Sequence, residues 1–216
     1  MPRKHLIRTC DFPYHVTARS NNKDFFYLHM DTLWDIFMES MTEAEKHFNC
    51  QFHAFVLMSN HYHLLVSTPN SNLDLVMNYL QREIARKANK ISSRINHFFG
   101  GPYKWSLICE ESYYWNALKY IFRNPIRAGL CDNVLSYQFS SLNSQPKKFN
   151  WRLTDFFNNR NTYISIDLDW LNEPFYNETE NNIQAALRRR EFQIPCDANG
   201  YRPTLDTPLS KKGRPT

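Results

Sequence analysis

Glycine, paired cysteines and long apolar runs are all scarce in this sequence. Its 5 glycines and 11 prolines among 216 residues exclude a collagen-like or linker-dominated chain. The 5 cysteines are odd in number, widely spread and nowhere spaced as C-x-x-C, which argues against a disulfide framework and a zinc ribbon. No unbroken aliphatic or aromatic run exceeds Ala54–Met58, and no apolar stretch follows the N-terminal charges. We therefore expect no signal peptide and no membrane-spanning helix, and we predict a cytoplasmic protein.

The charge of the chain is concentrated in one region. The formal net charge is +5, from 26 basic and 21 acidic residues. Between residues 82 and 127, nine basic residues stand against three acidic ones, namely Arg82, Arg86, Lys87, Lys90, Arg94, Lys104, Lys119, Arg123 and Arg127 against Glu83, Glu110 and Glu111. Such an excess is typical of a surface that binds a polyanion, although solvated helix faces would produce the same pattern.

The hydrophobic pattern alternates between strand and helix periods. Four runs have strand character, and three longer segments place apolar residues three and four positions apart. We predict strands at Tyr14–Arg19, Gln51–Leu57, Tyr62–Thr68 and Lys104–Cys109, and helices at 31–48 (with Asp31 as N-cap), 72–91 and from Ser112 toward Gly129. The order β-α-β-β-α-β-α predicts an α+β protein with the ferredoxin-like split βαβ fold, an antiparallel sheet and one added helix.

The composition changes after Leu142. Residues 143–148 are polar and contain Pro146, which is typical of a linker. The segment 151–216 holds only short periodic pieces, and 210–216 has the composition of a disordered tail. We predict a main domain at 1–142 and a C-terminal extension of unknown role at 143–216.

His61 and His63 are the first candidates for chemistry. Side chains alternate along a strand, so the two imidazoles project from one face while Tyr62 points to the other. Two neighbouring imidazoles make half of a metal site. The pattern alone leaves open that both histidines are ordinary packing residues. Another part of the chain must supply the remaining ligands and any nucleophile.

The last predicted helix carries a second polar set. Tyr120 and Asn124 lie four positions apart and share one helical face, and Arg123 and Arg127 repeat that spacing on an adjacent face. Pro125 has no amide hydrogen and disfavours helical geometry at Asn124, so we predict that the helix kinks or ends there. A polar residue at such a break is free to face a metal. The alternative is a core tyrosine with an asparagine cap before the proline.

Together, these segments resemble a known family. Leu57–Val66, with the sequence LMSNHYHLLV, is followed further along by Tyr120–Leu130, with the sequence YIFRNPIRAGL. The pair resembles the single-tyrosine HUH transposases and, within them, the REP-associated tyrosine transposases. The resemblance covers about residues 8–142, so that 1–142 would be the catalytic domain.

The resemblance implies a role for each site residue. His61 and His63 would be paired metal ligands, Asn124 the third protein ligand, and Tyr120 the nucleophile that forms a 5′-phosphotyrosine. It also implies Mg²⁺ or Mn²⁺ as cofactor, single-stranded or hairpin DNA as partner, and a monomer or homodimer. The implied activity is that of a metal-dependent single-stranded DNA endonuclease and strand transferase acting on hairpin or repetitive extragenic DNA.

The chemistry of these residue types agrees with that activity. A phenol with a pKa near 10 is only about one part in a thousand ionised at neutral pH, so a nearby cation or base must assist Tyr120. A divalent ion held by two imidazoles and one amide oxygen keeps positions open for phosphate oxygens. Imidazole ligands suit Mn²⁺ better than Mg²⁺.

Basic and aromatic residues supply the predicted DNA contacts. Four basic residues spaced by four form a stripe along the second helix that could follow a phosphate backbone: Arg82, Arg86, Lys90 and Arg94. We extend the prediction to three basic residues of the last helix, Lys119, Arg123 and Arg127. Three aromatic residues at the start of that helix either stack on unpaired bases or pack between helix and sheet, namely Tyr113, Tyr114 and Trp115.

Three other functions stay open. A DNA-hairpin-binding protein that does not cut would keep the basic stripe, although nothing in the sequence favours it. An RNA-binding ferredoxin-like module would stack bases on strand aromatics, but the glycine and aromatic run of that class is missing. A hydrolytic metalloenzyme would leave Tyr120 without a purpose.

Overall fold

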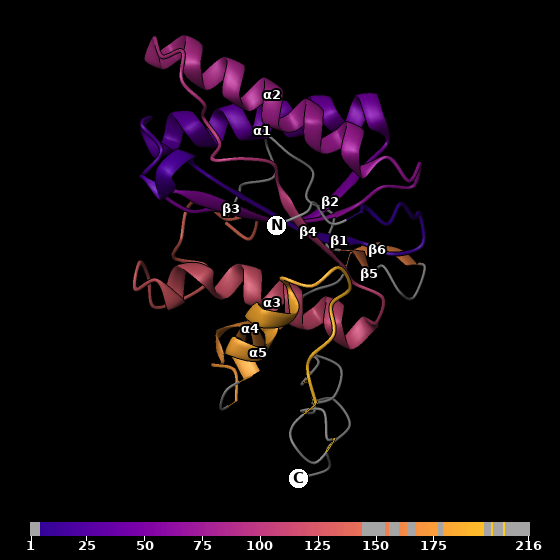
Figure 1. The fold of residues 1–216 in the computed structure, drawn as a ribbon. Helices are drawn as coiled ribbons and strands as arrows, with labels where there is room; N and C mark the ends of the chain where they lie inside the picture. Colours follow the sequence, from indigo (N-terminus) through magenta and orange to yellow (C-terminus); the bar gives the residue numbers. More distant parts are fainter. Residues whose placement is uncertain are drawn as a thin grey trace.

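The computed structural model describes residues 5–143, 154–155, 160–163, 167–176, 179–196, 200 and 205. In this part of the chain, a four-stranded antiparallel sheet lies between two helical layers (Figure 1). One face is covered by α1 (Met30–Phe48) and α2 (Leu73–Ser92). The other face is covered by α3 (Glu111–Arg127), against which α4 (Leu168–Asn172) and α5 (Thr179–Ala186) pack.

The strand order identifies the fold. β1 (Tyr14–Arg19), β2 (Gln51–Leu57), β3 (His61–Ser67) and β4 (Lys104–Leu107) are arranged as β2-β3-β1-β4. This is the order of the split βαβ plan, with β1 and β3 paired antiparallel in the centre. The predicted fold class is confirmed, and the four predicted strands agree within two residues at each end. The other described elements are a 3-10 turn, η1 (Asn21–Lys23), and a separate strand pair, β5 (Thr154–Asp155) and β6 (Arg160–Tyr163).

Each face of the sheet has its own hydrophobic core, because successive strand side chains alternate. Tyr62 belongs to the core under α1 and α2, where its ring meets that of Phe37 edge-on with centroids 5.3 Å apart. Leu65 and its cross-strand neighbour Ala54 belong to the core under α3. Within the described residues, no helix is both long enough and apolar enough to span a membrane.

The start of α1 differs from the prediction. His29 is the N-cap residue, and Asp31 lies in the first turn. The Asp31 carboxylate contacts His29 Nδ1 at 3.0 Å and accepts a hydrogen bond from the Gln138 amide at 3.3 Å. Its charge therefore lies near the positive end of the helix dipole without capping a backbone amide.

The prediction that α3 kinks or ends at Asn124 is wrong. The helix continues through Pro125 to Arg127. Gly129 follows with a φ of +69°. Its amide donates to the carbonyl of Ile126, and the amide of Leu130 donates to the carbonyl of Pro125. This Schellman ending holds the last turn from its C-terminal side, and so the helix tolerates one missing amide donor.

The chain beyond residue 142 contributes to the same core as α3. Trp170, Leu171, Ile183 and Phe192 are all buried in it, packed with residues of α3 and β2. The described part of the predicted C-terminal extension therefore packs into the core under α3. Most of the predicted linker and all of the predicted tail lie outside the described residues.

Candidate active site

His61 and His63 lie on the α3 side of the sheet, at the start of β3. Their cross-strand partners on β1 are Arg19 and Thr17, and their ring centroids are 5.1 Å apart. Tyr62 points into the opposite core, as its position in the strand predicts. The sequence-based expectation that the two imidazoles share one face is confirmed.

Each of these imidazoles has a hydrogen-bond partner at Nδ1. His61 Nδ1 lies 2.7 Å from the side-chain oxygen of Asn60, and His63 Nδ1 lies 2.9 Å from Nε2 of His15 on β1. Burial lowers the pKa of both His61 and His63, and neighbouring cationic groups lower it further. Both rings are therefore neutral, the form in which imidazole binds a metal.

Tyr120 presents its ring to the same site from α3. The rings of Tyr120 and His63 meet edge-on, with centroids 5.7 Å apart. Burial raises the pKa of the Tyr120 phenol, while the nearby Arg127 and a hydrogen bond with Gln184 of α5 lower it. Gln184 also accepts a hydrogen bond from Arg127 at 3.4 Å. The C-terminal segment thus supplies one of the groups that hold the phenol.

Asn124 lies one turn beyond Tyr120 on the same helix. Its Nδ2 donates to the backbone carbonyl of Tyr120 at 2.8 Å, which leaves the side-chain oxygen Oδ1 as the end of the amide available to a ligand. No group of three His, Cys, Asp or Glu residues suited to a metal ion occurs among the described residues. Two neutral imidazoles and one amide oxygen form a donor set that fits Mn²⁺ or Mg²⁺.

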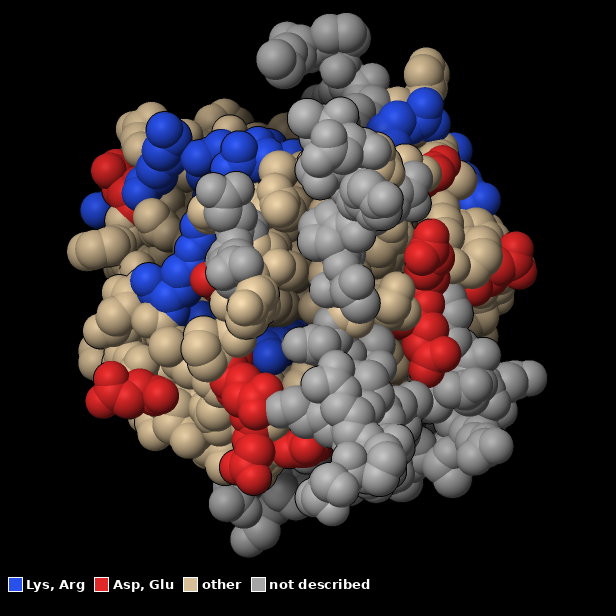
Figure 2. Space-filling model, turned by 90° about the horizontal axis from the view of Figure 1, so that it is seen from below, with Lys and Arg blue, Asp and Glu red and all other residues tan. Residues whose placement is uncertain are grey.

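Cationic side chains surround the site. Arg127 acts electrostatically on both Tyr120 and His63, Arg19 acts on His61, and Arg188 acts on Tyr120. Figure 2 looks at the molecule from the side of α3, α4 and α5, where Lys and Arg gather mainly in the upper half of the view and Asp and Glu predominate below. Charge on this face is therefore divided into a mainly basic and a mainly acidic part.

Lys119 and Arg123, which the sequence predicts as DNA contacts, are buried instead. The ammonium of Lys119 lies 4.6 Å from the ring centroid of Trp170. The guanidinium of Arg123 donates to the carbonyls of Leu171 and Asn172 at the end of α4. These two residues hold the C-terminal segment on α3, so we withdraw them from the DNA-contact set.

Arg123→Ala tests this structural role. Removing the guanidinium leaves two carbonyls at the end of α4 without their donor, and we expect the free energy of unfolding to fall by about 1–3 kcal/mol. Urea denaturation measures the loss, with Arg127→Ala on the exposed end of the same helix as a control expected within about 0.5 kcal/mol of wild type. Unchanged stability together with weakened DNA binding in Arg123→Ala would restore the predicted contact.

The basic stripe on α2 lies in the other helical layer, across the sheet from His61 and His63. Arg82 and Arg86 both contact Glu83, at 3.3 and 2.8 Å, so part of their charge is neutralised within the helix. Lys90 is exposed, and the guanidinium of Arg94 stacks over the ring of Tyr27 at 4.0 Å. The structure therefore does not bring the stripe and the site onto one surface.

The aromatic residues at the start of α3 pack inside the protein. Tyr113, Tyr114 and Trp115 are all buried in the core under α3, which is the packing alternative. An exposed aromatic ring nearer the site belongs to Phe25, which is 74% exposed. The sequence analysis did not single it out, because the short aromatic run Phe25–Tyr27 after the polar turn has no periodic pattern that separates exposed from buried rings.

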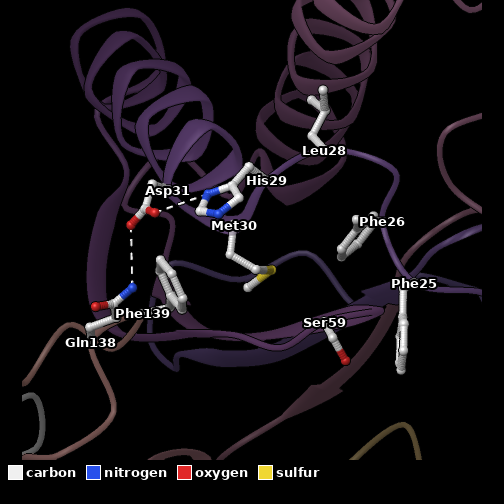
Figure 3. A pocket seen from close by; sticks show the side chains of 9 residues that line it. All are labelled: Phe25, Phe26, Leu28, His29, Met30, Asp31, Ser59, Gln138 and Phe139. Atoms are coloured by element: carbon white, nitrogen blue, oxygen red, sulfur yellow. Dashed lines mark hydrogen bonds and ion pairs between the residues drawn. The ribbon is translucent and has the colours of Figure 1, made fainter.

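Phe25 stands at the rim of an apolar pocket beside the turn that precedes His61 (Figure 3). The pocket has a volume of about 460 Å³, with Phe26, Leu28, Met30 and Phe139 among its apolar lining residues. Two hydrogen bonds connect the loop that carries Phe25 to the β2–β3 turn. The backbone amide of Phe26 donates to the carbonyl of Ser59 at 2.8 Å, and the side-chain amide of Asn60 donates to the carbonyl of Lys23 at 3.0 Å.

Fold and site together define a ferredoxin-like α+β protein that presents paired imidazoles beside a buried tyrosine. The family model for IS200-like transposases matches residues 9–123, more than half of the chain. The chain therefore belongs to the IS200-like transposase family, a family of DNA-processing proteins.

One solved structure shares this fold. The chain is similar to a REP-associated tyrosine transposase bound to a REP hairpin, with a TM-score of 0.56 and 16% identity over 73% of this chain and 96% of the other. A structure described as that of a transposase from Deinococcus radiodurans R1 has a TM-score of 0.38 and 16% identity, covering 53% of this chain and 89% of the other, and we draw nothing from it. The comparison with curated proteins finds no match.

Proposed function

We propose that this protein is a metal-dependent single-stranded DNA endonuclease and strand transferase that uses Tyr120 as its nucleophile. The observation that carries the proposal is the contact of the Tyr120 ring with His63, one of two neutral imidazoles whose Nδ1 atoms both have partners. This arrangement leaves two Nε2 atoms for a metal next to a phenol. In a transposase family, such a site is suited to attack on a phosphodiester.

Each site residue has its own role in the displacement at phosphorus. His61, His63 and Asn124 would hold the divalent ion, which supplies charge stabilisation for the phosphate oxygens when bound. The Tyr120 oxygen forms a bond to phosphorus as the P–O3′ bond breaks, the phenol proton passes to water, and the released 3′ oxygen takes up a proton. The products are a 5′-phosphotyrosine and a free 3′-hydroxyl. Arg127 lies close enough to stabilise the phenolate electrostatically.

We propose hairpin DNA with an unpaired flank as the substrate. A REP hairpin is bound in the transposase structure that this chain resembles in fold. The exposed ring of Phe25, on the loop bonded to the β2–β3 turn, is suited to stack on an unpaired base. The exposed guanidinium of Arg127 is suited to a backbone phosphate.

Trapping a covalent complex tests the function. Labelled single-stranded DNA from the flanks of the gene, incubated with the protein and Mn²⁺, is expected to give an adduct that survives denaturing electrophoresis and disappears when EDTA is added first. Hairpin binding with no adduct in any metal would instead indicate a binding protein that does not cut.

The basic stripe on α2 contributes to backbone binding through Lys90 and Arg94, whose charges are not neutralised by Glu83. Replacing Lys90 and Arg94 together by glutamine is expected to lower the slope of log affinity against log salt by about 1.4, since each phosphate contact on a single strand contributes roughly 0.7. Fluorescence anisotropy at several salt concentrations measures the slope.

Arg86→Gln is the matched control on the same helix, because its guanidinium already contacts Glu83. We expect its slope to stay near that of wild type. A slope left unchanged by the double replacement would place the DNA away from α2.

A further inference from the structure

His15 is a buried polar residue of β1 that neither the sequence motifs nor the proposed reaction uses. It is 2% exposed, and its Nε2 lies 2.9 Å from Nδ1 of His63. The two rings are stacked, with centroids 5.2 Å apart and planes inclined by 27°. In the β1–β3 register, His15 is two residues from Thr17, the cross-strand partner of His63, so both rings lie on the same face of the sheet.

We propose that His15 is the positioning residue of the metal site, accepting a hydrogen bond from the Nδ1–H of His63 and so directing the Nε2 lone pair of His63 at the metal. The inference rests on the proposed function, because it assigns His63 as a ligand.

The contact between the two rings permits only two proton arrangements. In the first, His63 Nδ1 donates to His15 Nε2, and His63 keeps a lone pair on Nε2. In the second, His15 Nε2 donates to His63 Nδ1, and His63 carries its hydrogen on Nε2, where it cannot bind a metal. A ring nitrogen that binds a metal is thus selected by the bond that the other nitrogen makes.

Asn60 plays the same part for His61. Its side-chain oxygen lies 2.7 Å from His61 Nδ1 and, as a carbonyl acceptor, it holds the hydrogen there. Both candidate ligands therefore have an acceptor behind Nδ1, one from the turn before β3 and one from β1. This correspondence favours the first arrangement for His63.

The surroundings of His15 argue against a purely structural role. Among the residues that the structure describes, its buried Nδ1 has no hydrogen-bond partner, and neither does the buried hydroxyl of Ser106, the cross-strand neighbour of His15 on β4. An unpartnered buried polar atom lowers stability, so an apolar side chain would serve packing better. Such a group is retained where it has a function.

An imidazole also suits the expected substrate better than the carboxylate that often stands behind a metal-bound histidine. A carboxylate would place a negative charge beside a site that receives a DNA phosphate. The imidazole of His15 accepts the same hydrogen bond without bringing that charge into the site.

His15→Phe is the decisive variant, since it keeps the ring and the stacking but removes the acceptor. We expect Mn²⁺ affinity, measured by calorimetry and electron paramagnetic resonance, to fall by about 10–100-fold. We expect only a small change in the free energy of unfolding, because the loss of the unpartnered His15 Nδ1 offsets the loss of the acceptor for His63 Nδ1. His15→Gln offers an amide oxygen as acceptor and is expected to recover part of the affinity.

Nitrogen-15 spectra of histidine-labelled wild-type protein with Mg²⁺ give a second readout that needs no variant. The first arrangement predicts hydrogen on Nδ1 of His63, and hydrogen on Nε2 would overturn the inference. Wild-type Mn²⁺ affinity in His15→Phe would overturn it too, while leaving the proposed function intact. If the wild-type protein binds no Mn²⁺, the proposed metal site itself fails, and the inference fails with it.

Discussion

Tyr120→Phe is expected to abolish the covalent DNA adduct while leaving hairpin binding and stability close to wild type. The substitution removes one oxygen and keeps the ring that contacts His63. Loss of the nucleophile of a covalent mechanism lowers the rate by roughly four to six orders of magnitude. Denaturing electrophoresis measures the adduct, and anisotropy measures hairpin affinity.

Tyr114→Phe is the matched control, because Tyr114 is a buried tyrosine of the same helix. It lies about 9 Å from Tyr120 along the helix axis, outside reach of the same phosphate. We expect its adduct yield to equal that of wild type. Peptide mapping of the trapped complex by mass spectrometry adds a direct check, and a nucleotide on any other tyrosine would contradict the assignment.

Replacing His61 and His63 together by alanine is expected to remove metal binding and to lower cleavage by at least about 10³-fold. Loss of a preorganised group that stabilises transition-state charge has this order of effect. Calorimetry with Mn²⁺ measures binding, and circular dichroism confirms that the fold survives. His29→Ala, which removes an exposed surface histidine, is the control.

The pH dependence of metal binding follows from the same geometry. Burial lowers the pKa of His61 and His63 from the ordinary value of 6.5, so protons compete with the metal only at more acidic pH. Mn²⁺ affinity should therefore stay flat from neutral pH through 6.5, where ordinary histidines would compete with the metal, and fall only at more acidic pH. Unchanged metal-dependent cleavage in the double alanine variant would show that other residues hold the ion.

The sequence by itself determined the features that depend on neighbours along the chain. Strand and helix periods identified all four strands of the main sheet, and the order of the elements predicted the split βαβ fold. The shared face of His61 and His63 needed only the two-residue period of a strand, and that of Tyr120 and Asn124 only the helical repeat. These are local properties of the backbone.

Only the tertiary structure decided which side chains meet across elements. The contact of His15 with His63 depends on the register between β1 and β3, and the contact of Gln184 with Tyr120 depends on how α5 packs on α3. Neither pair has a spacing signal in the sequence.

The burial of a side chain, and the face of the sheet on which it lies, likewise could not be predicted from local sequence patterns. In the sequence, Lys119 and Arg123 look the same as basic residues that are exposed to DNA. Only the packing of α4 on α3 shows that both side chains are enclosed. The stripe on α2 and the histidines of β3 are separated because side chains on opposite faces of a sheet belong to different cores. Helix α3 passes through Pro125, by contrast, with its last turn secured by local bonds from the amides of Gly129 and Leu130, a helix ending for which Gly129 is the sequence signal.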